Sequence, residues 1–144
     1  MSKAVILAGG QGERFWPLTR KDFPKYRIRW DGKRSLLQGT FERLAKIYGK
    51  SNVYVVTTRS HVPMIKEELP RLPAKRVLVE PFRNNTCAAI LLSCAVLEKE
   101  FGSDETVSFF PADHLIRDTA AFTKSLREAA RLARSKDLLV TIGL

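Results

Sequence analysis

A glycine-rich turn followed by cations, LAGGQGERFWPLTRKDFPK from Leu7 to Lys25, holds the residues best suited to binding an anion. Glycines allow backbone N–H groups to turn toward phosphate oxygens and to approach them closely. Arg14 can then bind these oxygens as a fork, and Lys25 can add a point charge. The spacing is not a dinucleotide fingerprint, because Phe15 stands at the third glycine position, and no lysine follows directly as in a P-loop. Glycine after a strand is most often just a tight turn, but two cations at this spacing favour a phosphate site.

A second candidate site is the Pro-Ala-Asp-His motif at positions 111–114. Asp113 stands at the end of an apolar run, and a hard carboxylate there suits Mg²⁺, which keeps most of its waters and takes one or two protein carboxylates. In the ordinary alternative, Asp113 is a helix cap or a turn residue. We interpret His114 as a supporting or packing residue. We assign no role to His61, which we expect in a helix far from these loops.

The formal net charge is +10, and residues 20–34 carry half of it. A basic cluster is typical of a site for phosphate or nucleic acid. A solvated, charge-rich loop is the usual explanation of such a run, so the cluster alone leaves the choice open. The segment contains seven cations, Arg20, Lys21, Lys25, Arg27, Arg29, Lys33 and Arg34, against two carboxylates, Asp22 and Asp31.

Strand-like runs alternate with helical patterns along the chain. The apolar, β-rich runs occupy residues 3–8, 53–58, 76–80, 106–110 and 138–142. This alternation predicts a Rossmann-like α/β fold, with a largely parallel sheet and helices on both faces. In such a sheet, ligands bind beyond the carboxyl ends of the strands. The glycine turn, the loop at 80–86 and the motif at 111–114 all begin at such ends.

Helical periodicity and capping residues predict four helices. Ser35 and Gln38 form a capping box at the start of the first. The third helix is apolar on much of its surface, which predicts that it is well buried. The expected helices begin at Ser35, Ser60, Asn85 or Thr86, and Asp118, and the first two run to about Tyr48 and Leu69.

The 144 residues fit one domain or part of one. No apolar run reaches the roughly 18 residues of a membrane span, and the opening MSKAVILAGG is a poor signal peptide. Cys87 and Cys94 fall seven positions apart in a helical pattern, so their Cα atoms are about 10 Å apart, too far for a disulfide. We expect two buried thiols on one helix face. These features favour a cytoplasmic protein with no membrane partner.

The motif LAGGxGxR followed by Pro24-Lys25 resembles the signature of sugar-1-phosphate nucleotidylyltransferases. Further motifs follow over the whole chain: WPLTR at 16–20, SLLQ at 35–38, EPxxNNT at 80–86 and PADH at 111–114. As a set they are similar to the mannose branch of this superfamily. The resemblance implies the conversion of GTP and mannose 1-phosphate to GDP-mannose and pyrophosphate, with Mg²⁺ as the cofactor.

This resemblance, with the chemistry of the side chains, implies a nucleotide site. Arg14 and Lys25 are the expected catalytic residues. Arg14 stabilises the pyrophosphate leaving group, and Lys25 neutralises charge at the reacting phosphates. Asp113 is the expected metal ligand. The expected nucleotide-binding set is Leu7, Ala8, Gly9, Gly10, Gly12, Arg14, Lys25, Glu80, Asn85, Thr86 and Asp113.

Glu80, at the end of the run at 76–80, is the candidate residue for recognising the base. An ionised carboxylate only accepts hydrogen bonds, so it can receive the adjacent N1–H and N2–H₂ donors of guanine. Adenine presents an acceptor at N1 and would be repelled. In the alternative interpretation, Glu80 pairs with Arg83 or Arg76 and never meets a base.

The sequence departs from the family pattern at two places. Tyr26-Arg27-Ile28 replaces the usual Gln-Phe-Leu, so Arg27 takes an apolar position, and Asn84-Asn85 replaces the usual Arg-Asn. The family's sugar-phosphate residues and its second metal-binding aspartate follow after the part that resembles residues 1–144. We therefore interpret residues 1–144 as the N-terminal, nucleotide-binding portion of a catalytic domain. The run at 138–142 is then expected to be a strand with an exposed apolar edge.

Two other interpretations remain open. One is another nucleotidylyltransferase of the same superfamily, with a different base or sugar. The other is a basic, non-catalytic nucleic-acid-binding module, which would show a steep salt dependence with oligonucleotides. This module ranks lower, because it leaves the Gly-Arg-Lys spacing and the PADH motif unexplained. A homo-oligomer is compatible with either enzyme interpretation.

Overall fold

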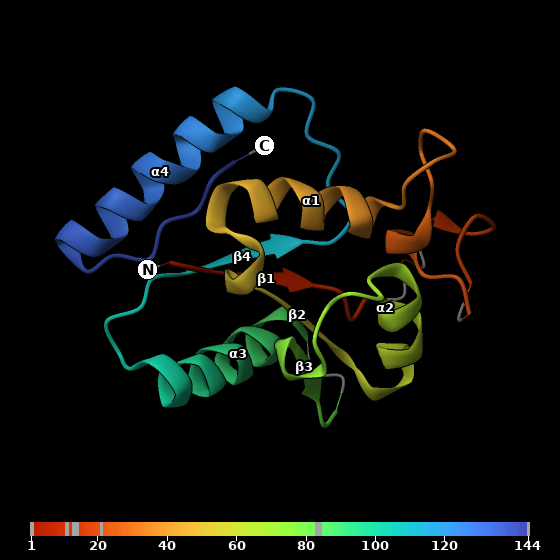
Figure 1. The fold of residues 1–144 in the computed structure, drawn as a ribbon, viewed down its shortest axis with the longest axis horizontal. Coiled ribbons are helices and arrows are strands. Elements are labelled where there is room, and N and C mark those ends of the chain that lie inside the picture. Colours follow the sequence, from red (N-terminus) through yellow and green to blue (C-terminus); the bar gives the residue numbers. More distant parts are fainter. Residues whose placement is uncertain (1, 11, 13–14, 21, 83–84, 144) are drawn as a thin grey trace.

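The computed structural model describes residues 2–10, 12, 15–20, 22–82 and 85–143. These residues form a four-stranded parallel sheet in the order β3-β2-β1-β4 (Figure 1). The parallel sheet confirms the predicted fold class. The strands are β1 Lys3–Leu7, β2 Val53–Thr58, β3 Val77–Glu80 and β4 Val107–Pro111.

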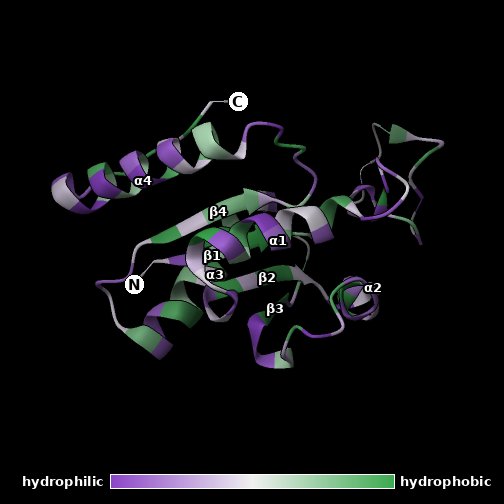
Figure 2. Ribbon diagram, turned by 45° about the horizontal axis from the view of Figure 1, so that its top comes forward, coloured by the Kyte–Doolittle hydropathy of each residue, from purple (hydrophilic) through white to green (hydrophobic). Residues whose placement is uncertain are grey.

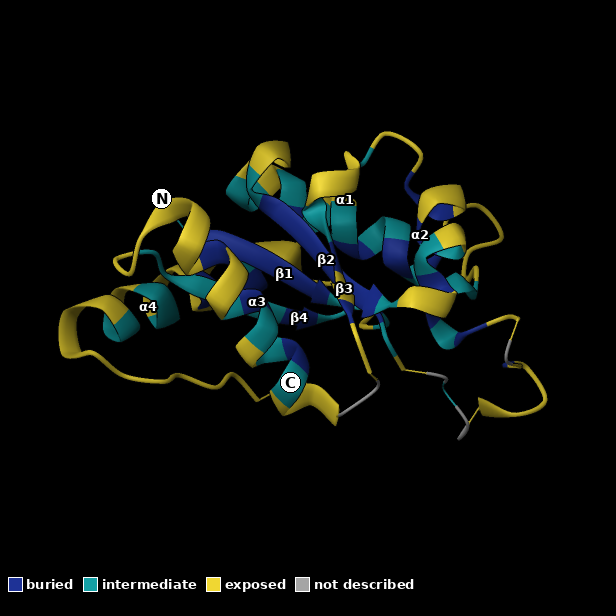
Figure 3. Cartoon of the chain, turned by 90° about the horizontal axis from the view of Figure 1, so that it is seen from below, coloured by how far each residue is buried: buried dark blue, intermediate teal, exposed yellow. Residues whose placement is uncertain are grey.

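The carboxyl ends of the strands meet at one edge of the sheet. The two central strands, β1 and β2, are buried along almost their whole length (Figure 3), which explains their uninterrupted apolar sequences. Leu7 pairs with both Val56 and Pro111, and Thr58 pairs with Glu80. The loops that follow β1, β3 and β4 therefore begin at the same edge of the sheet, with those after β1 and β4 on neighbouring strands.

Helices cover both faces of the sheet, as predicted (Figure 1). Helices α1, α2 and α4 pack on one face, where Ile6 and Val55 meet Leu37 and Phe122. Helix α3 packs on the other face, where Val5 and Val56 meet Ala89 and Leu97. The helices are α1 Leu36–Tyr48, α2 Val62–Glu68, α3 Asn85–Phe101 and α4 Thr119–Lys136.

Hydrophobic and hydrophilic residues alternate along α4 (Figure 2), and its Phe122 and Leu126 are buried. This pattern is typical of a helix that packs one stripe against a core. Among the described residues, no helix is long and apolar enough to cross a membrane.

Two predicted helix caps are confirmed and one is wrong. Ser35 and Gln38 make both hydrogen bonds of the capping box, and Asp118 accepts from the Ala121 N–H at 2.9 Å. Ser60 does not cap α2, because a 3₁₀ turn over Arg59–His61 comes first and His61 takes the N-cap position. The Ser60 hydroxyl lies instead 3.1 Å from that of Thr58.

The expected burial of the third helix is also wrong. Only one stripe of α3 is buried, at Ala89, Ser93 and Leu97, while Leu91 on another side is 65% exposed. The two cysteines are free, with Cys87 exposed and Cys94 half-buried, rather than two buried thiols. The apolar composition of a helix does not determine how many of its faces pack against other elements. Helix α3 packs on the sheet through one face.

The expected strand at residues 138–142 is not formed. The segment is irregular, and Leu138 and Leu139 are both exposed. An apolar, β-rich run becomes a strand only where a neighbouring strand completes its hydrogen bonds. Among the described residues, β4 pairs with β1 alone.

Candidate functional site

The described residues surround a cavity of about 720 Å³ at the carboxyl ends of β1, β3 and β4. This volume lies within the range of ligand sites, about 300–1,000 Å³. Arg14, one of the two expected catalytic residues, lies outside the described residues. All the other expected nucleotide-binding residues line the cavity: Leu7, Ala8, Gly9, Gly10, Gly12, Lys25, Glu80, Asn85, Thr86 and Asp113.

The glycine turn closes onto Lys25 at Gly12. Gly12 has a φ of +69°, in the left-handed region that favours glycine. A Cβ at Gly12 would lie 2.8 Å from Lys25 Cβ. The buried Thr19 donates from Oγ1 to the Gly12 carbonyl at 2.7 Å. The absence of a side chain at Gly12 therefore lets the turn approach the segment that carries Lys25.

Lys25 and Asp113 form an ion pair at the cavity, with 2.8 Å between Nζ and Oδ2. Lys25 belongs to the 3₁₀ turn η2, Lys25–Arg27, and Asp113 follows β4. The ammonium also lies 4.0 Å from the centre of the Phe15 ring, a cation–π contact. Both charged side chains are about a quarter exposed, at 26% and 28%, so water screens the pair. An anion that enters the cavity can therefore replace the Asp113 carboxylate as the partner of the Lys25 ammonium.

Glu80 lies beside the glycine turn. It is the last residue of β3 and only 7% exposed, and a Cβ at Gly9 would lie 3.0 Å from its Oε2. Arg76, one alternative partner, directly precedes β3, at the opposite end of the strand from Glu80, and donates to the carbonyl of Lys50, which lies before β2. Arg83, the other alternative partner, lies outside the described residues. The Glu80 carboxylate is thus positioned at the cavity wall, next to the backbone of Gly9.

Asn85 and Thr86 place the start of α3 at the cavity. The first N–H groups of a helix have no partner within the helix, and its dipole favours anions at that end. Asn85 adopts a φ of +60°, an uncommon conformation that asparagine tolerates better than most residues. The cavity thus combines a helix N-terminus with the glycine turn and Lys25, an arrangement suited to phosphate groups.

His61 supports the glycine turn, which corrects the expectation that it lies far from these loops. It is only 3% exposed, and its Nδ1 lies 3.4 Å from the Ala8 carbonyl oxygen. Thr57 Oγ1 donates to the same carbonyl at 2.8 Å. The His61 ring packs edge-on against Tyr26, whose pKa burial raises well above its ordinary value, so Tyr26 remains a neutral phenol. The His61–Ala8 contact joins residues 53 positions apart, and no local sequence signal indicates it.

The carboxylate of Asp113 fits a Mg²⁺ ion held mainly by phosphate oxygens and water. Within the described ranges, no group of three or more His, Cys, Asp or Glu side chains could hold a metal ion. The part of the chain that the structure describes therefore holds no metal cage built wholly from these side chains. The partly exposed carboxylate of Asp113, at a cavity of this size, suits an ion that arrives with a nucleotide.

Residues 3–144 match the protein family described as Nucleotidyl transferase. The alginate biosynthesis protein AlgA of Pseudomonas fluorescens is 39% identical over 142 residues, which cover 97% of this chain and 29% of that protein. The mannose-1-phosphate guanylyltransferase RfbM of Salmonella typhimurium is 38% identical over 144 residues, again 97% of this chain and 29% of that protein. The chain thus spans less than a third of the length of these curated relatives.

Solved structures share the fold. A crystal structure described as a mannose-1-phosphate geranyltransferase from Thermus thermophilus superposes with a TM-score of 0.80 at 33% identity, covering 92% of this chain and 38% of that one. A mannose-6-phosphate isomerase from Helicobacter pylori, at 24% identity and a TM-score of 0.71, covers 92% and 46% and shows the fold alone. Enzymes of the nucleotidyltransferase family bind a nucleoside triphosphate and a sugar phosphate, and they generally use a divalent metal.

Proposed function

Since the chain belongs to the nucleotidyl transferase family, we propose that it forms the nucleotide-binding portion of an enzyme that transfers GMP from GTP to mannose 1-phosphate. The products are GDP-mannose and pyrophosphate. The observation that carries this proposal is the cavity that joins the glycine turn, the Lys25–Asp113 pair and Glu80 at one edge of the sheet. The likeness to a mannose-1-phosphate guanylyltransferase supports this choice of substrates.

The proposed chemical step is an in-line displacement at the α-phosphorus of GTP. A phosphate oxygen of mannose 1-phosphate forms a bond to that phosphorus. The bond from the α-phosphorus to the bridging oxygen breaks, and the electron pair leaves with pyrophosphate. Such a step depends mainly on positioning and on neutralising charge, rather than on covalent chemistry from the protein.

The residues of the cavity supply these two effects. The backbone N–H groups around Gly10 and Gly12 are proposed to bind the phosphates. Lys25 is proposed to leave its ion pair with Asp113, to bind the phosphates instead and to neutralise their charge. Asp113, once released from Lys25, would be one ligand of Mg²⁺, which when bound neutralises and orients the phosphate oxygens. From the sequence alone, Arg14 is assigned to the pyrophosphate leaving group.

The test of this proposal is a panel of nucleoside triphosphates and sugar 1-phosphates, with Mg²⁺ and the complete gene product, read by pyrophosphate release. We expect release only with GTP and mannose 1-phosphate. Release with another pair would assign the protein to a different branch of the family. A steep salt dependence with oligonucleotides, together with no response to GTP, would favour the nucleic-acid-binding module instead.

Lys25→Ala tests the phosphate role. A charge-assisted hydrogen bond is worth roughly 1.5–3 kcal/mol, so we expect kcat to fall at least tenfold. The side chain is partly exposed, and its ion pair is screened by water, so the unfolding temperature should change little. Steady-state kinetics and thermal unfolding measure the two quantities. A variant with normal kcat would contradict the role assigned to Lys25.

Glu80→Gln tests the choice of base. The amide cannot accept from both guanine donors, so we expect the preference for GTP over ATP in kcat/KM to shrink by about 1–3 kcal/mol, the usual effect of an unpaired polar group. The exposed Glu98 on α3 provides the matched control, and Glu98→Gln should leave that preference unchanged. An equal preference in Glu80→Gln and the wild type would show that Glu80 does not recognise the base.

A further inference from the structure

We propose that Glu68 is a positioning residue for Lys25 and that it acts through Arg27; this inference rests on the phosphate role proposed for Lys25. Glu68 is the last residue of α2. The described wall of the cavity does not include it. Any effect of Glu68 on the chemistry must therefore pass through the residues that it contacts.

Lys25 lies in a short turn that side chains hold in place. The backbone hydrogen bonds of η2 are local: Arg27 N–H donates to Pro24 at 2.9 Å, and Ile28 N–H donates to Lys25 at 3.1 Å. The buried Tyr26 packs against His61, and Arg27 reaches α2. The placement of Lys25 Nζ at the cavity thus depends on how the two following side chains are fixed.

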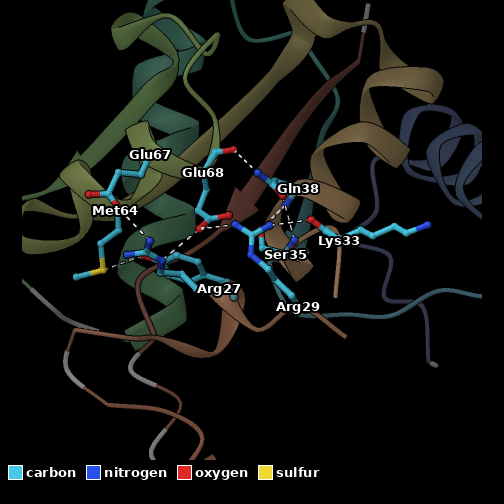
Figure 4. Close-up of polar contacts among 9 residues, drawn as sticks. Arg27, Arg29, Lys33, Ser35, Gln38, Met64, Glu67 and Glu68 are labelled. Atoms are coloured by element: carbon cyan, nitrogen blue, oxygen red, sulfur yellow. Dashed lines mark hydrogen bonds and ion pairs between the residues drawn. The ribbon is translucent and has the colours of Figure 1, made fainter. Parts of the chain in front are cut away.

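Arg27 is fixed by two carboxylates of α2 (Figure 4). Its Nε donates to Glu68 Oε1 at 3.2 Å, and its Nη2 donates to Glu67 Oε2 at 2.8 Å. Arg29 Nη2 approaches the same Glu68 oxygen to 3.8 Å. Two guanidinium groups from the segment after Lys25 therefore converge on the carboxylate of Glu68.

The two carboxylates differ in their surroundings. The Glu68 side chain is 3% exposed, whereas that of Glu67 is 61% exposed. Water screens an exposed ion pair, which holds its partner weakly, while a buried pair keeps its geometry. Glu68 is thus the contact that can define the position of Arg27, and Glu67 is a natural control.

The backbone of Glu68 is itself fixed from α1. Gln38, the third helical residue in the capping box of α1, donates from Nε2 to the Glu68 carbonyl at 2.9 Å (Figure 4). Helices α1 and α2 both pack on the central strands. Glu68 therefore connects the 25–27 turn to the rigid part of the fold.

Stability alone does not explain a carboxylate at this position. Burying a charge is costly, and the C-terminal end of a helix disfavours a negative one. Glu68 Oε2 is buried and has no hydrogen-bond partner among the described residues. A well-packed apolar pair often stabilises a protein as well as a buried ion pair does. What the ion pair adds is a directional contact that fixes Arg27, two residues after Lys25.

The experiment uses a double-mutant cycle in the complete gene product, with Lys25→Ala, Glu68→Gln and the double variant. Glu67→Gln is the matched control. Displacement of a catalytic group by about 1 Å lowers turnover by roughly 100-fold, so we expect Glu68→Gln to lower kcat between 10- and 100-fold, with the KM for GTP changed much less. Glu67→Gln should change kcat less than about twofold. In the Lys25→Ala background, Glu68→Gln should have almost no further effect.

The outcomes separate this inference from the proposed function. If Lys25→Ala lowers kcat while Glu68→Gln leaves it normal, the positioning role is wrong and the proposed function stands. If the losses of the two single variants multiply in the double variant, Glu68 acts independently of Lys25 and the inference is also wrong. If Lys25→Ala has normal kcat, the phosphate role of Lys25 fails, and this inference fails with it.

Arg27→Lys keeps the experiment decisive if Glu68→Gln does not fold. Lysine retains the positive charge beside Glu68 but loses the fixed geometry of the two contacts made by Nε and Nη2. We expect Arg27→Lys to lower kcat by about 10-fold or more. In the Lys25→Ala background, the same substitution should have almost no further effect on kcat. Normal kcat in Arg27→Lys would overturn the inference.

Discussion

Gly12 is the residue of the glycine turn at which a side chain has the least room. Its φ of +69° disfavours other residues by roughly 1–2 kcal/mol, and a Cβ would lie 2.8 Å from Lys25 Cβ. We expect Gly12→Ala to lower the free energy of unfolding by at least that amount and to lower kcat by about 10-fold or more, because Lys25 must move. Denaturant unfolding and steady-state kinetics measure the two effects.

Gly32 offers the matched control for this substitution. It has almost the same φ, +70°, but a Cβ there would meet nothing within 4 Å. Gly32→Ala should therefore show the cost of backbone strain while leaving kcat unchanged. Equal kcat in the two alanine variants would show that the contact between Gly12 and Lys25 does not matter for catalysis.

At the residue scale, the sequence predicted what local chemistry specifies. Gly12, Lys25, Glu80 and Asp113 could be selected because each lies in a turn or at the end of a strand and carries a property that phosphate, base or metal binding requires. All four line the cavity, and their roles stay predictions. The contact of His61 with Ala8 could not be predicted, because the two residues are 53 positions apart and no sequence motif links them. The Lys25–Asp113 pair was likewise not foreseen, although both residues were selected.

At the scale of elements, the two cysteines of α3 differ in exposure, although they are seven positions apart and lie on nearly the same face of the helix. Cys87 is exposed, whereas Cys94 is half-buried and burial raises its pKa. A raised pKa lowers the thiolate fraction at a given pH, and the thiolate is the form that reacts. We expect iodoacetamide at pH 8 to modify Cys87 faster than Cys94, as followed by mass spectrometry. In denaturant the two rates should become similar; faster modification of Cys94 in the folded protein would contradict this packing of α3.

The elements that the sequence predicted are those with local signals. The capping box at Ser35 and the cap at Asp118 fixed two helix starts, and uninterrupted apolar runs identified the four strands of the sheet. The run at 138–142 carries the same strand signal, but its state depends on a neighbouring strand, which no local pattern reveals. The prediction that α3 is well buried was wrong for a related reason, because the whole fold determines how many faces of a helix pack against other elements.

At the scale of the whole molecule, β3 and β4 are the edges of the described sheet, and the exposed run 138–142 follows α4. Exposed apolar chain and strand edges favour association between copies. We therefore expect the isolated 144-residue polypeptide to self-associate in a concentration-dependent way. Sedimentation velocity measures this association, with residues 1–137 as the control that lacks the apolar run. A monomer at all concentrations would contradict this expectation.

The isolated polypeptide also tests how the work is divided along the chain. Lys25 and Glu80 are assigned to the nucleotide and Asp113 to the metal, and we assign none of the described residues to the phosphate of the sugar. The curated relatives are more than three times as long as the part that this chain matches. We expect residues 1–144 alone to bind GTP with Mg²⁺ weakly and to make no GDP-mannose, as measured by equilibrium binding and by pyrophosphate release. Sustained release above a control without protein would show that these residues suffice for catalysis, and the assignment of the sugar phosphate to a separate portion would then be wrong.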